Sequence, residues 1–257
     1  GAVAYTDAMV DDSRLVLRVL QDSIDLGGCA INYTEAKELI IKNSKVVGVK
    51  IQDKTSSTLL SLESSTVINA TGAWADSVRK DVCDEQKVRP LRGSHAVISA
   101  SICPVSDVFT FLHPKDKRGV YVYPWENTVV LGTTDLDHNE ELNLEPKISN
   151  TELNYLIDGF NSQFDKVKID RKDIISTWAG VRPVIGSGKG KDPSKERRDH
   201  VVWNNNGLIT VSGGKLTTFR LIALDTLDQA KATLPKPKDI ADHAMFKTPQ
   251  KTGHHVD

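Results

Sequence analysis

Two adjacent glycines followed by a lysine form an anion-binding pattern in segment 212–220, which reads Ser-Gly-Gly-Lys-Leu-Thr-Thr-Phe-Arg. An apolar run precedes this segment and an amphipathic stretch follows it, which predicts a strand, a glycine turn and the first turn of a helix. Gly213 and Gly214 let the backbone approach a bound group closely, and the N–H groups of a helix start favour negative charge. The alternative is a tight connection with Lys215 on the surface.

A second glycine turn, Thr71-Gly72, follows the apolar run 66–69 and precedes a helical start that extends to Asp76. Nucleotide cofactors meet open α/β sheets at the carboxyl ends of buried parallel strands. Ala70, Thr71 and Gly72 are therefore candidates for cofactor contact. An ordinary connection between a strand and a helix is the alternative.

The first third of the chain contains the elements that must position these turns. Asp11 or Asp12 caps a predicted helix that Gly27-Gly28 closes and that we expect to pack against other structure. Its apolar positions are Leu15, Val16, Val19, Leu20 and Ile24. Residues 30–34, 38–42, 45–52 and 58–62 are predicted strands of a hairpin or meander with a turn at Asn43-Ser44.

From residue 89 onward, alternating apolar and polar positions predict an antiparallel sheet with strands at 94–99, 108–112, 119–123 and 128–131. Ser149 and Glu152 form a capping box for a helix expected to cover one face of it. Residues 174–180 predict another strand. Pro183 is expected to end it and to hold Arg182 at the strand end. A glycine- and lysine-rich loop at 187–198 leads to a strand at 199–203.

Composition restricts the classes of protein and partner. A chain of 257 residues with 39% hydrophobic content can form one large domain or two smaller ones. The net charge of −1 indicates no nucleic-acid partner, so any anion site is local. The three cysteines lack metal-ligand or disulfide spacing, which indicates reduced thiols and no metal site.

No apolar run approaches the roughly 20 residues of a membrane-spanning helix. We expect a soluble fold, with peripheral contact to a membrane left open. The chain opens without methionine and ends in a polar stretch at 235–257, and we interpret it as a piece of a longer protein.

Eight segments, in order from the start of the chain to about Ala230, resemble the FAD-dependent glycerol-3-phosphate dehydrogenases. Each segment is weak alone, but their shared order makes the resemblance specific. The segments are Tyr5-x-Asp-Ala-x-x-Asp-Asp-x-Arg-Leu15, Val67-Ile-Asn-Ala-Thr-Gly72, Arg92-Gly-Ser-His95, Pro124-Trp125, Gly132-Thr-Thr-Asp135, Trp178-Ala-Gly-Val-Arg-Pro183, Arg198-Asp199 and Gly213-Gly-Lys-Leu-Thr-Thr-x-Arg220.

The resemblance implies an α/β (α+β) fold. In that family a discontinuous FAD-binding domain of glutathione-reductase type is interleaved with an antiparallel-sheet substrate domain covered by helices. Residues 1–80 and 200–232 would belong to the FAD-binding domain and 81–199 to the substrate domain, with 233–257 a polar tail or the start of a further segment. The family's G-x-G-x-x-G turn for the FAD pyrophosphate does not occur in this sequence. We therefore expect the chain alone to be colourless.

The activity implied by the resemblance is FAD-dependent oxidation of sn-glycerol 3-phosphate to dihydroxyacetone phosphate, with hydride transfer to flavin and electrons passed to a quinone. An oxygen-using glycerophosphate oxidase, which shares the motifs, is the alternative enzyme. A truncated chain that binds a small phosphorylated molecule without catalysis is the non-enzymatic alternative. The implied location is the cytoplasm, the cytoplasmic face of a membrane, or the mitochondrion in a eukaryote.

A phosphorylated substrate needs fixed cations, and the planar guanidinium group of arginine suits phosphate well. The resemblance makes Arg182 and Arg198 the candidates for substrate binding, with Arg182 also counted among the catalytic candidates. A structural salt bridge is the alternative role for Arg182. For Arg198 the alternative is membership of a solvated charged run, together with Lys195 and Arg197.

Removing hydride from C2 requires the hydroxyl proton to leave, and histidine is the usual base near neutral pH. His95 is the histidine that lies within a matching motif, although the segment that precedes these motifs in the family is an alternative source of the base. A helix start and a lysine stabilise negative charge on a reduced flavin. Lys215, Leu216, Thr217 and Thr218 are the candidates for this contact, and Lys215 could equally face the substrate phosphate.

Overall fold

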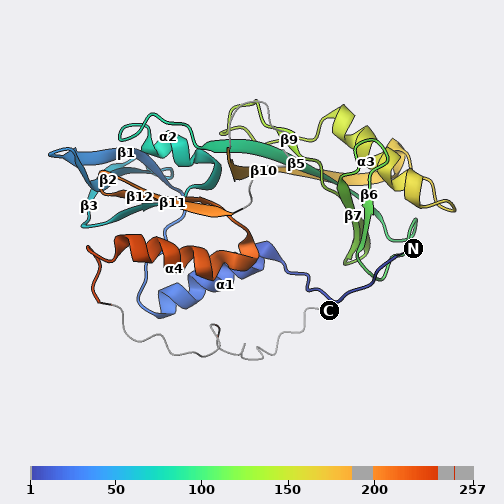
Figure 1. The fold of residues 1–257 in the computed structure, drawn as a ribbon, viewed down its shortest axis with the longest axis horizontal. Helices are drawn as coiled ribbons and strands as arrows, with labels where there is room; N and C mark the ends of the chain where they lie inside the picture. Colours follow the sequence, from blue (N-terminus) through green and yellow to red (C-terminus); the bar gives the residue numbers. More distant parts are fainter. Residues whose placement is uncertain (1, 187–198, 237–245, 247–257) are drawn as a thin grey trace.

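The computed structural model describes residues 2–186, 199–236 and 246, and it is a mixed α/β fold of sheets and helices. Figure 1 shows an elongated molecule in which two long paired strands, β5 (Val88–Ser99) and β10 (Ile174–Ile185), extend away from helix α2 (Ala75–Arg79) toward helix α3 (Asn150–Gln163). These two strands connect the halves of the molecule that hold the candidate residues.

A three-stranded antiparallel meander consists of β1 (Thr34–Lys42), β2 (Lys45–Asp53) and β3 (Leu59–Glu63). Asn43 and Ser44 have φ angles of 51° and 60°, the positive values that a two-residue hairpin of type I′ requires. The predicted turn is confirmed. The strand predicted at 30–34 is wrong, because Tyr33 has a positive φ of 52° and the extended backbone begins at Thr34.

A second sheet has the order β11 (His200–Asn205), β12 (Leu208–Gly213) and β4 (Val67–Asn69), with β12 and β4 parallel. Strand β4 leads into the 3-10 turn η1 (Gly72–Trp74) and α2, and β12 leads into η4 (Leu216–Thr218) and α4 (Phe219–Ala230). The strand–turn–helix predictions are confirmed at both places. Strand β4 is less buried than expected, since Ile68 is 41% exposed.

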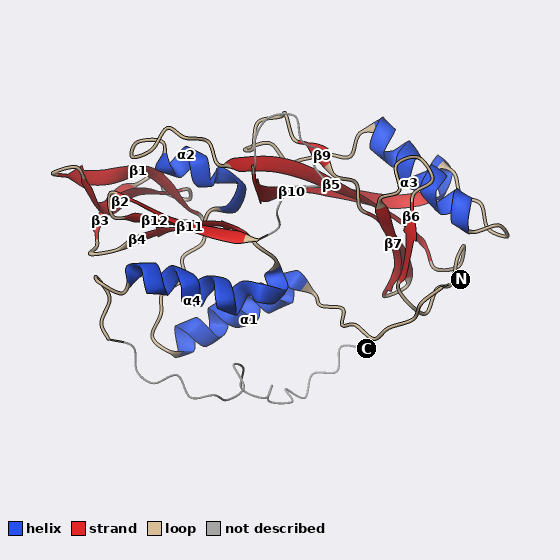
Figure 2. Ribbon diagram, in the orientation of Figure 1, coloured by secondary structure: helices blue, strands red, loops and turns tan. Residues whose placement is uncertain are grey.

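The third sheet is antiparallel and has the order β10-β5-β8-β7-β6, with the short β9 (Leu136–Asp137) also paired to β5. Its other strands are β6 (Phe109–Leu112), β7 (Gly119–Trp125) and β8 (Thr128–Gly132). Helix α3 covers one face, where Leu156 and Phe160 pack on alternate residues of β5, β7 and β8. The predicted capping box of Ser149 and Glu152 is confirmed. Figure 2 shows the strands and this helix by type.

Strand β10 continues past the position where a stop was expected. It extends to Ile185, so Arg182 lies within the strand and not at its end. Pro183 stands opposite Pro90 of β5. Neither proline has an N–H to donate, so this pair must occupy a non-hydrogen-bonded position of the ladder, where β10, as the edge strand, tolerates the ring.

Helix α1 (Asp12–Asp25) begins at the predicted cap, where the Asp11 carboxylate accepts the N–H of Arg14 at 3.0 Å. This helix packs on the rest of the described chain only in part, because Leu15 and Val19 are half-buried, none of its residues is fully buried, and Val16 is 47% exposed. Across the described residues, no helix is long and apolar enough to cross a membrane.

Candidate functional site

The two glycine turns lie at one edge of the second sheet. Strands β4 and β12 are parallel and adjacent, so Thr71-Gly72 and Gly213-Gly214 follow neighbouring carboxyl ends. The end of β10 reaches both turns. A Cβ atom built on Gly72 would lie 3.9 Å from Pro183 Cγ, and one on Gly213 would lie 3.2 Å from Ile185 Cγ1. The strand that carries Arg182 therefore touches both predicted cofactor turns.

The turn after β12 requires its glycines. Gly213 and Gly214 have φ angles of +82° and +80°, which side chains rarely adopt. A Cβ atom on Gly213 would also lie 2.5 Å from the Asp199 carbonyl oxygen. Lys215, which is exposed, is the N-cap residue of η4 and makes no side-chain capping hydrogen bond. The first N–H groups of the helix are thus left for an external acceptor, which suits a phosphate or a flavin carbonyl.

The turn after β4 has the same construction. Gly72 has a φ of +62°, and Ala70 and Thr71 are exposed beside it. Thr71 is the N-cap residue of η1 and makes no side-chain capping hydrogen bond. Two uncapped helical starts at one sheet edge fit a bound dinucleotide, whose phosphate and ring oxygens accept hydrogen bonds.

Arg182 reaches across the face of the antiparallel sheet that α3 leaves open. A Cβ atom on Gly93 would overlap its guanidinium group, so the side chain crosses β5 where a glycine makes room. Nη2 donates to Thr133 Oγ1 at 3.2 Å and to the Thr134 carbonyl at 3.0 Å, and Nη1 lies 3.4 Å from Asp135 Oδ1.

Asp135 is a buried carboxylate between two arginines. Its side chain has no exposed area, and Arg118 Nη2 lies 3.2 Å from its Oδ2 atom. The structural ion pair considered as an alternative for Arg182 is therefore present. The Arg182 side chain is nonetheless 35% exposed, so this ion pair fixes the guanidinium group without burying it.

His95 lies next to Arg182 on the same open face. Its ring stacks on Trp178, with centroids 4.8 Å apart and planes 10° from parallel, and it covers Gly132, where a Cβ atom would overlap the imidazole. Burial and the charge of Arg182 lower the pKa of His95 to about 4. The imidazole is therefore neutral at neutral pH. Its Nδ1 atom is buried without a hydrogen-bond partner among the described residues.

The structure thus brings His95 and Arg182 together on the open sheet face, and it brings Ala70 to Gly72 and Gly213 to Thr218 together at the adjacent sheet edge. Arg198 lies outside the described residues. Sequence reasoning missed Trp178, Asp135 and the space-making role of Gly93. All three lie in or beside the matched motifs, but their roles depend on the pairing of β10 with β5, which the motifs do not state.

Comparison with known proteins defines the class. The family model described as "FAD dependent oxidoreductase" matches residues 1–223, and the chain belongs to that family.

Within that family, the chain is 35% identical over 240 residues to the aerobic glycerol-3-phosphate dehydrogenase of Staphylococcus aureus (strain USA300), covering 92% of this chain and 43% of the relative. The crystal structure of the glycerol-3-phosphate dehydrogenase from Bacillus halodurans, complexed with FAD, matches with a TM-score of 0.78 at 29% identity and covers 86% of this chain and 43% of that one. An FAD-bound L-alpha-glycerophosphate oxidase from Mycoplasma pneumoniae shares the fold, with a TM-score of 0.54 at 17% identity, covering 77% of this chain and 50% of that one. The chain spans less than half the length of the first two relatives.

Proposed function

We propose that this chain acts as part of an FAD-dependent glycerol-3-phosphate dehydrogenase of the length of its relatives. The observation that carries the proposal is that β10 contacts both glycine turns. The strand that carries Arg182 therefore adjoins the starts of η1 and η4, which we take to hold a flavin nucleotide. The relatives named glycerol-3-phosphate dehydrogenase support the choice of substrate.

Bound FAD would supply the hydride acceptor. The residues that would hold it are Ala70, Thr71 and Gly72 on one side, and Gly213, Gly214, Lys215, Leu216, Thr217 and Thr218 on the other. Both turns present backbone N–H groups at positive-φ glycines, so the cofactor oxygens would be bound by main chain. Lys215 adds a positive charge at the start of η4, where negative charge on a reduced flavin would be stabilised.

Two side chains on the open sheet face would act on the substrate. The Arg182 guanidinium, fixed by Asp135 and Thr134, would bind the phosphate, with Arg198 as a second cation. His95 would accept the C2 hydroxyl proton. Its lowered pKa keeps the imidazole neutral, the form that accepts a proton, but also makes it a weaker base; the negative charge of a phosphate bound at Arg182 would offset the Arg182 charge that contributes to this shift.

The finer architecture belongs to the same proposal. The cofactor domain is of the glutathione-reductase type and comprises residues 1–80 and 200–232, and residues 81–199 form the substrate domain. The parallel pairing of β4 with β12 supports this assignment, since it joins segments about 140 residues apart in one sheet. Electrons pass to a quinone, and the whole protein docks peripherally on the membrane that contains it.

The test uses the whole protein with sn-glycerol 3-phosphate, first with a quinone analogue without oxygen and then with oxygen alone. We expect reduction of the quinone analogue, and no turnover with glycerol or with sn-glycerol 1-phosphate. Rapid peroxide formation without quinone reduction would replace the dehydrogenase by an oxidase. A protein whose flavin is not reduced by sn-glycerol 3-phosphate under either condition would contradict both.

A further inference from the structure

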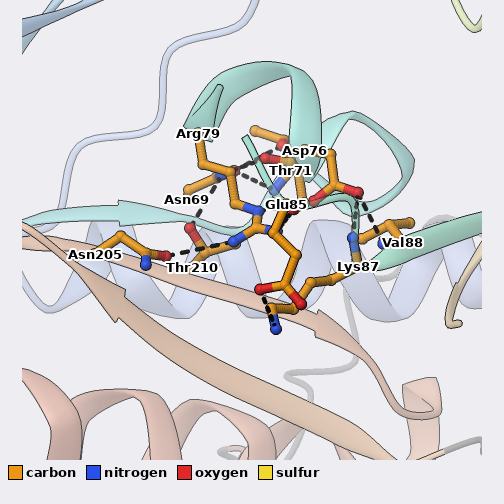
Figure 3. Close-up of polar contacts among 10 residues, drawn as sticks. Asn69, Thr71, Asp76, Arg79, Glu85, Lys87, Val88, Asn205 and Thr210 are labelled. Carbon is orange, nitrogen blue, oxygen red and sulfur yellow. Dashed lines mark hydrogen bonds and ion pairs between the residues drawn. The ribbon is translucent and has the colours of Figure 1, made fainter. Parts of the chain in front are cut away.

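Asn69 is a buried side chain at the end of β4, immediately before the first glycine turn. It is 2% exposed. Its Nδ2 atom donates to the Ala75 carbonyl at 2.9 Å and to Thr210 Oγ1 at 3.3 Å. Its Oδ1 atom accepts the N–H of Thr71 at 3.3 Å and the hydroxyl of Thr71 at 2.7 Å. Figure 3 shows Asn69 between Thr71 and Thr210.

These contacts hold both ends of the segment that contains the Thr71-Gly72 turn. The oxygen of Asn69 holds the residue before Gly72, and its nitrogen holds the carbonyl of the residue that begins α2. The hydrogen bond to Thr210 joins the turn to β12, the strand that carries the second glycine turn. The Thr71 N–H is already bound and Ala73 is buried, so the half-buried Gly72, whose N–H has no intrahelical acceptor at a helical start, is the donor that we assign to a ligand.

Only an amide side chain satisfies this set of partners. The Ala75 carbonyl needs a donor and the Thr71 N–H needs an acceptor, and asparagine supplies both from one short side chain. An aspartate of the same shape would set carboxylate oxygen against carbonyl oxygen in a buried site, where an unsatisfied group is costly.

The segment that Asn69 closes is also tied to the antiparallel sheet. Asp76 of α2 accepts the N–H groups of Lys87 and Val88 at 2.9 and 2.8 Å, and it lies 2.7 Å from the Nε atom of the fully buried Arg79. Figure 3 shows these contacts beside Asn69. A displacement of the turn would therefore be resisted at the start of β5, the strand that carries His95.

We propose that Asn69 is a positioning residue that holds the Thr71-Gly72 turn in the conformation that binds FAD. The inference rests on the proposed function, because it takes FAD as the ligand of this turn. Asn69 touches backbone and Thr210, so it acts through the turn and not on the reacting atoms.

The test compares Asn69→Ala and Asn69→Asp with Asn161→Ala in the whole protein. Asn161 is a matched control, because its amide also bridges backbone, with Nδ2 donating to the Ile169 carbonyl at 2.9 Å and Oδ1 accepting the Ile169 N–H at 2.9 Å, but in the α3 region. The measurements are Tm, the Kd for FAD of the deflavinated protein well below Tm, and hydrogen exchange at Gly72 and Ala73 with and without FAD.

Both Asn69 variants are expected to bind FAD about tenfold or more weakly, the loss expected for a misplaced hydrogen-bonding turn. They should also lose the slowing of exchange that FAD causes at the turn, whereas Asn161→Ala lowers Tm and leaves the FAD Kd unchanged. Equal Kd values for wild type and Asn69→Ala, or equal weakening in Asn161→Ala, would overturn the positioning role. If the wild type itself does not bind FAD, the proposed function fails and the inference with it.

Discussion

Arg182 makes the structural ion pair that the sequence left as one alternative, and phosphate binding remains its proposed role. Its ion pair with Asp135 and its hydrogen bond to the Thr134 carbonyl fix the guanidinium group, while the side chain stays 35% exposed. A fixed guanidinium loses less conformational entropy on binding phosphate than a mobile one. At the scale of single residues, the ion pair with Asp135 is therefore compatible with the phosphate-binding role that we propose for Arg182.

We expect Arg182→Ala in the whole protein to raise the KM for sn-glycerol 3-phosphate about 10- to 100-fold, the worth of a charge-assisted hydrogen bond to phosphate. Arg182→Lys should recover only part of this loss, because lysine cannot make the planar two-point contact. Arg171→Ala is the control, since within the described part of the chain Arg171 binds Asn150 and Asn154 of α3, away from Arg182. Steady-state kinetics decides, and an unchanged KM in Arg182→Ala removes Arg182 from the site.

His95 should titrate well below the usual range of histidine. Its pKa of about 4 lies below the unfolded value of about 6.5, so unfolding takes up a proton between these two pH values. The stability contribution of His95 is therefore present above about pH 6.5 and is lost as pH falls toward 4. We expect the ring protons of His95 in NMR spectra to titrate near pH 4, and nearer neutrality in Arg182→Ala. A titration near 6.5 in the wild type would contradict the buried, cation-adjacent setting.

At the scale of elements, two glycines make room for side chains on the open face of the antiparallel sheet. Gly93 and Gly132 make room for Arg182 and His95, whereas a Cβ atom on Gly180 would have no atom within 4 Å. Gly93 and Gly180 stand opposite each other on β5 and β10. Alanine at Gly93 would therefore clash with a side chain, whereas alanine at Gly180, the facing position, would not.

Gly93→Ala is expected to raise the KM for sn-glycerol 3-phosphate, by less than the increase of about 10- to 100-fold expected for Arg182→Ala. The added methyl group would displace the guanidinium group and would also crowd Thr133 Oγ1, 2.7 Å away. Gly180→Ala should leave the KM near that of the wild type. Thermal unfolding of both variants shows whether the sheet remains intact. Equal KM values for the two variants would show that Arg182 does not depend on the gap at Gly93.

Glu152 ties the start of α3 to the sheet. Its carboxylate lies 2.8 Å from Arg92 Nη2, accepts the hydroxyls of Ser94 and Thr134, and caps the helix through the Ser149 N–H. Burial acts to raise the pKa of Glu152, but the hydrogen bonds outweigh it and lower the pKa below its usual value. The carboxylate is therefore ionised at neutral pH in a buried network.

We expect Glu152→Gln to lower the free energy of unfolding by about 3–5 kcal/mol, because it leaves the buried Arg92 without its main counter-charge. Glu140→Gln is the matched control. Glu140 binds the same arginine at 3.2 Å but its side chain is 56% exposed, so the loss should be about 0–1 kcal/mol. Urea unfolding of both variants measures the difference in unfolding free energy. Similar losses would mean that burial does not determine how much each ion pair of Arg92 contributes to stability.

Local sequence patterns predicted the helices, strands and turns, but they could not predict which strands pair when these lie far apart in the sequence. The Ser149 cap, the Asn43-Ser44 turn and the two glycine turns are specified by neighbouring residues, and the structure has them where the pattern placed them. The parallel pairing of β4 with β12 joins residues far apart in sequence. The continuation of β10 through Pro183 depends on a facing proline, and the gap at Gly93 depends on a side chain from another strand.

For the molecule as a whole, two hollows of the described surface lie apart from the candidate site. One lies beside α2 and the other between β11 and α4. Neither is lined by Arg182, Gly72 or Gly213. Apolar residues of α1 are likewise exposed, with Val16 at 47% and Ile24 at 46%. Small-molecule sites normally bury most of their ligand, and this chain covers only 43% of the FAD-complexed relative.

We therefore expect the purified chain of 257 residues to be colourless and the whole protein to carry a flavin absorption band. The two proposed cofactor turns would bind cofactor oxygens, but the sequence has no G-x-G-x-x-G turn for the pyrophosphate, and burial of the flavin ring and the adenosine needs more apolar surface than two turns provide. Visible absorbance after purification with added FAD, followed by gel filtration, measures the stoichiometry. A band of one flavin per chain would show that the residues present here enclose FAD by themselves, and the cofactor turns would then form a complete site.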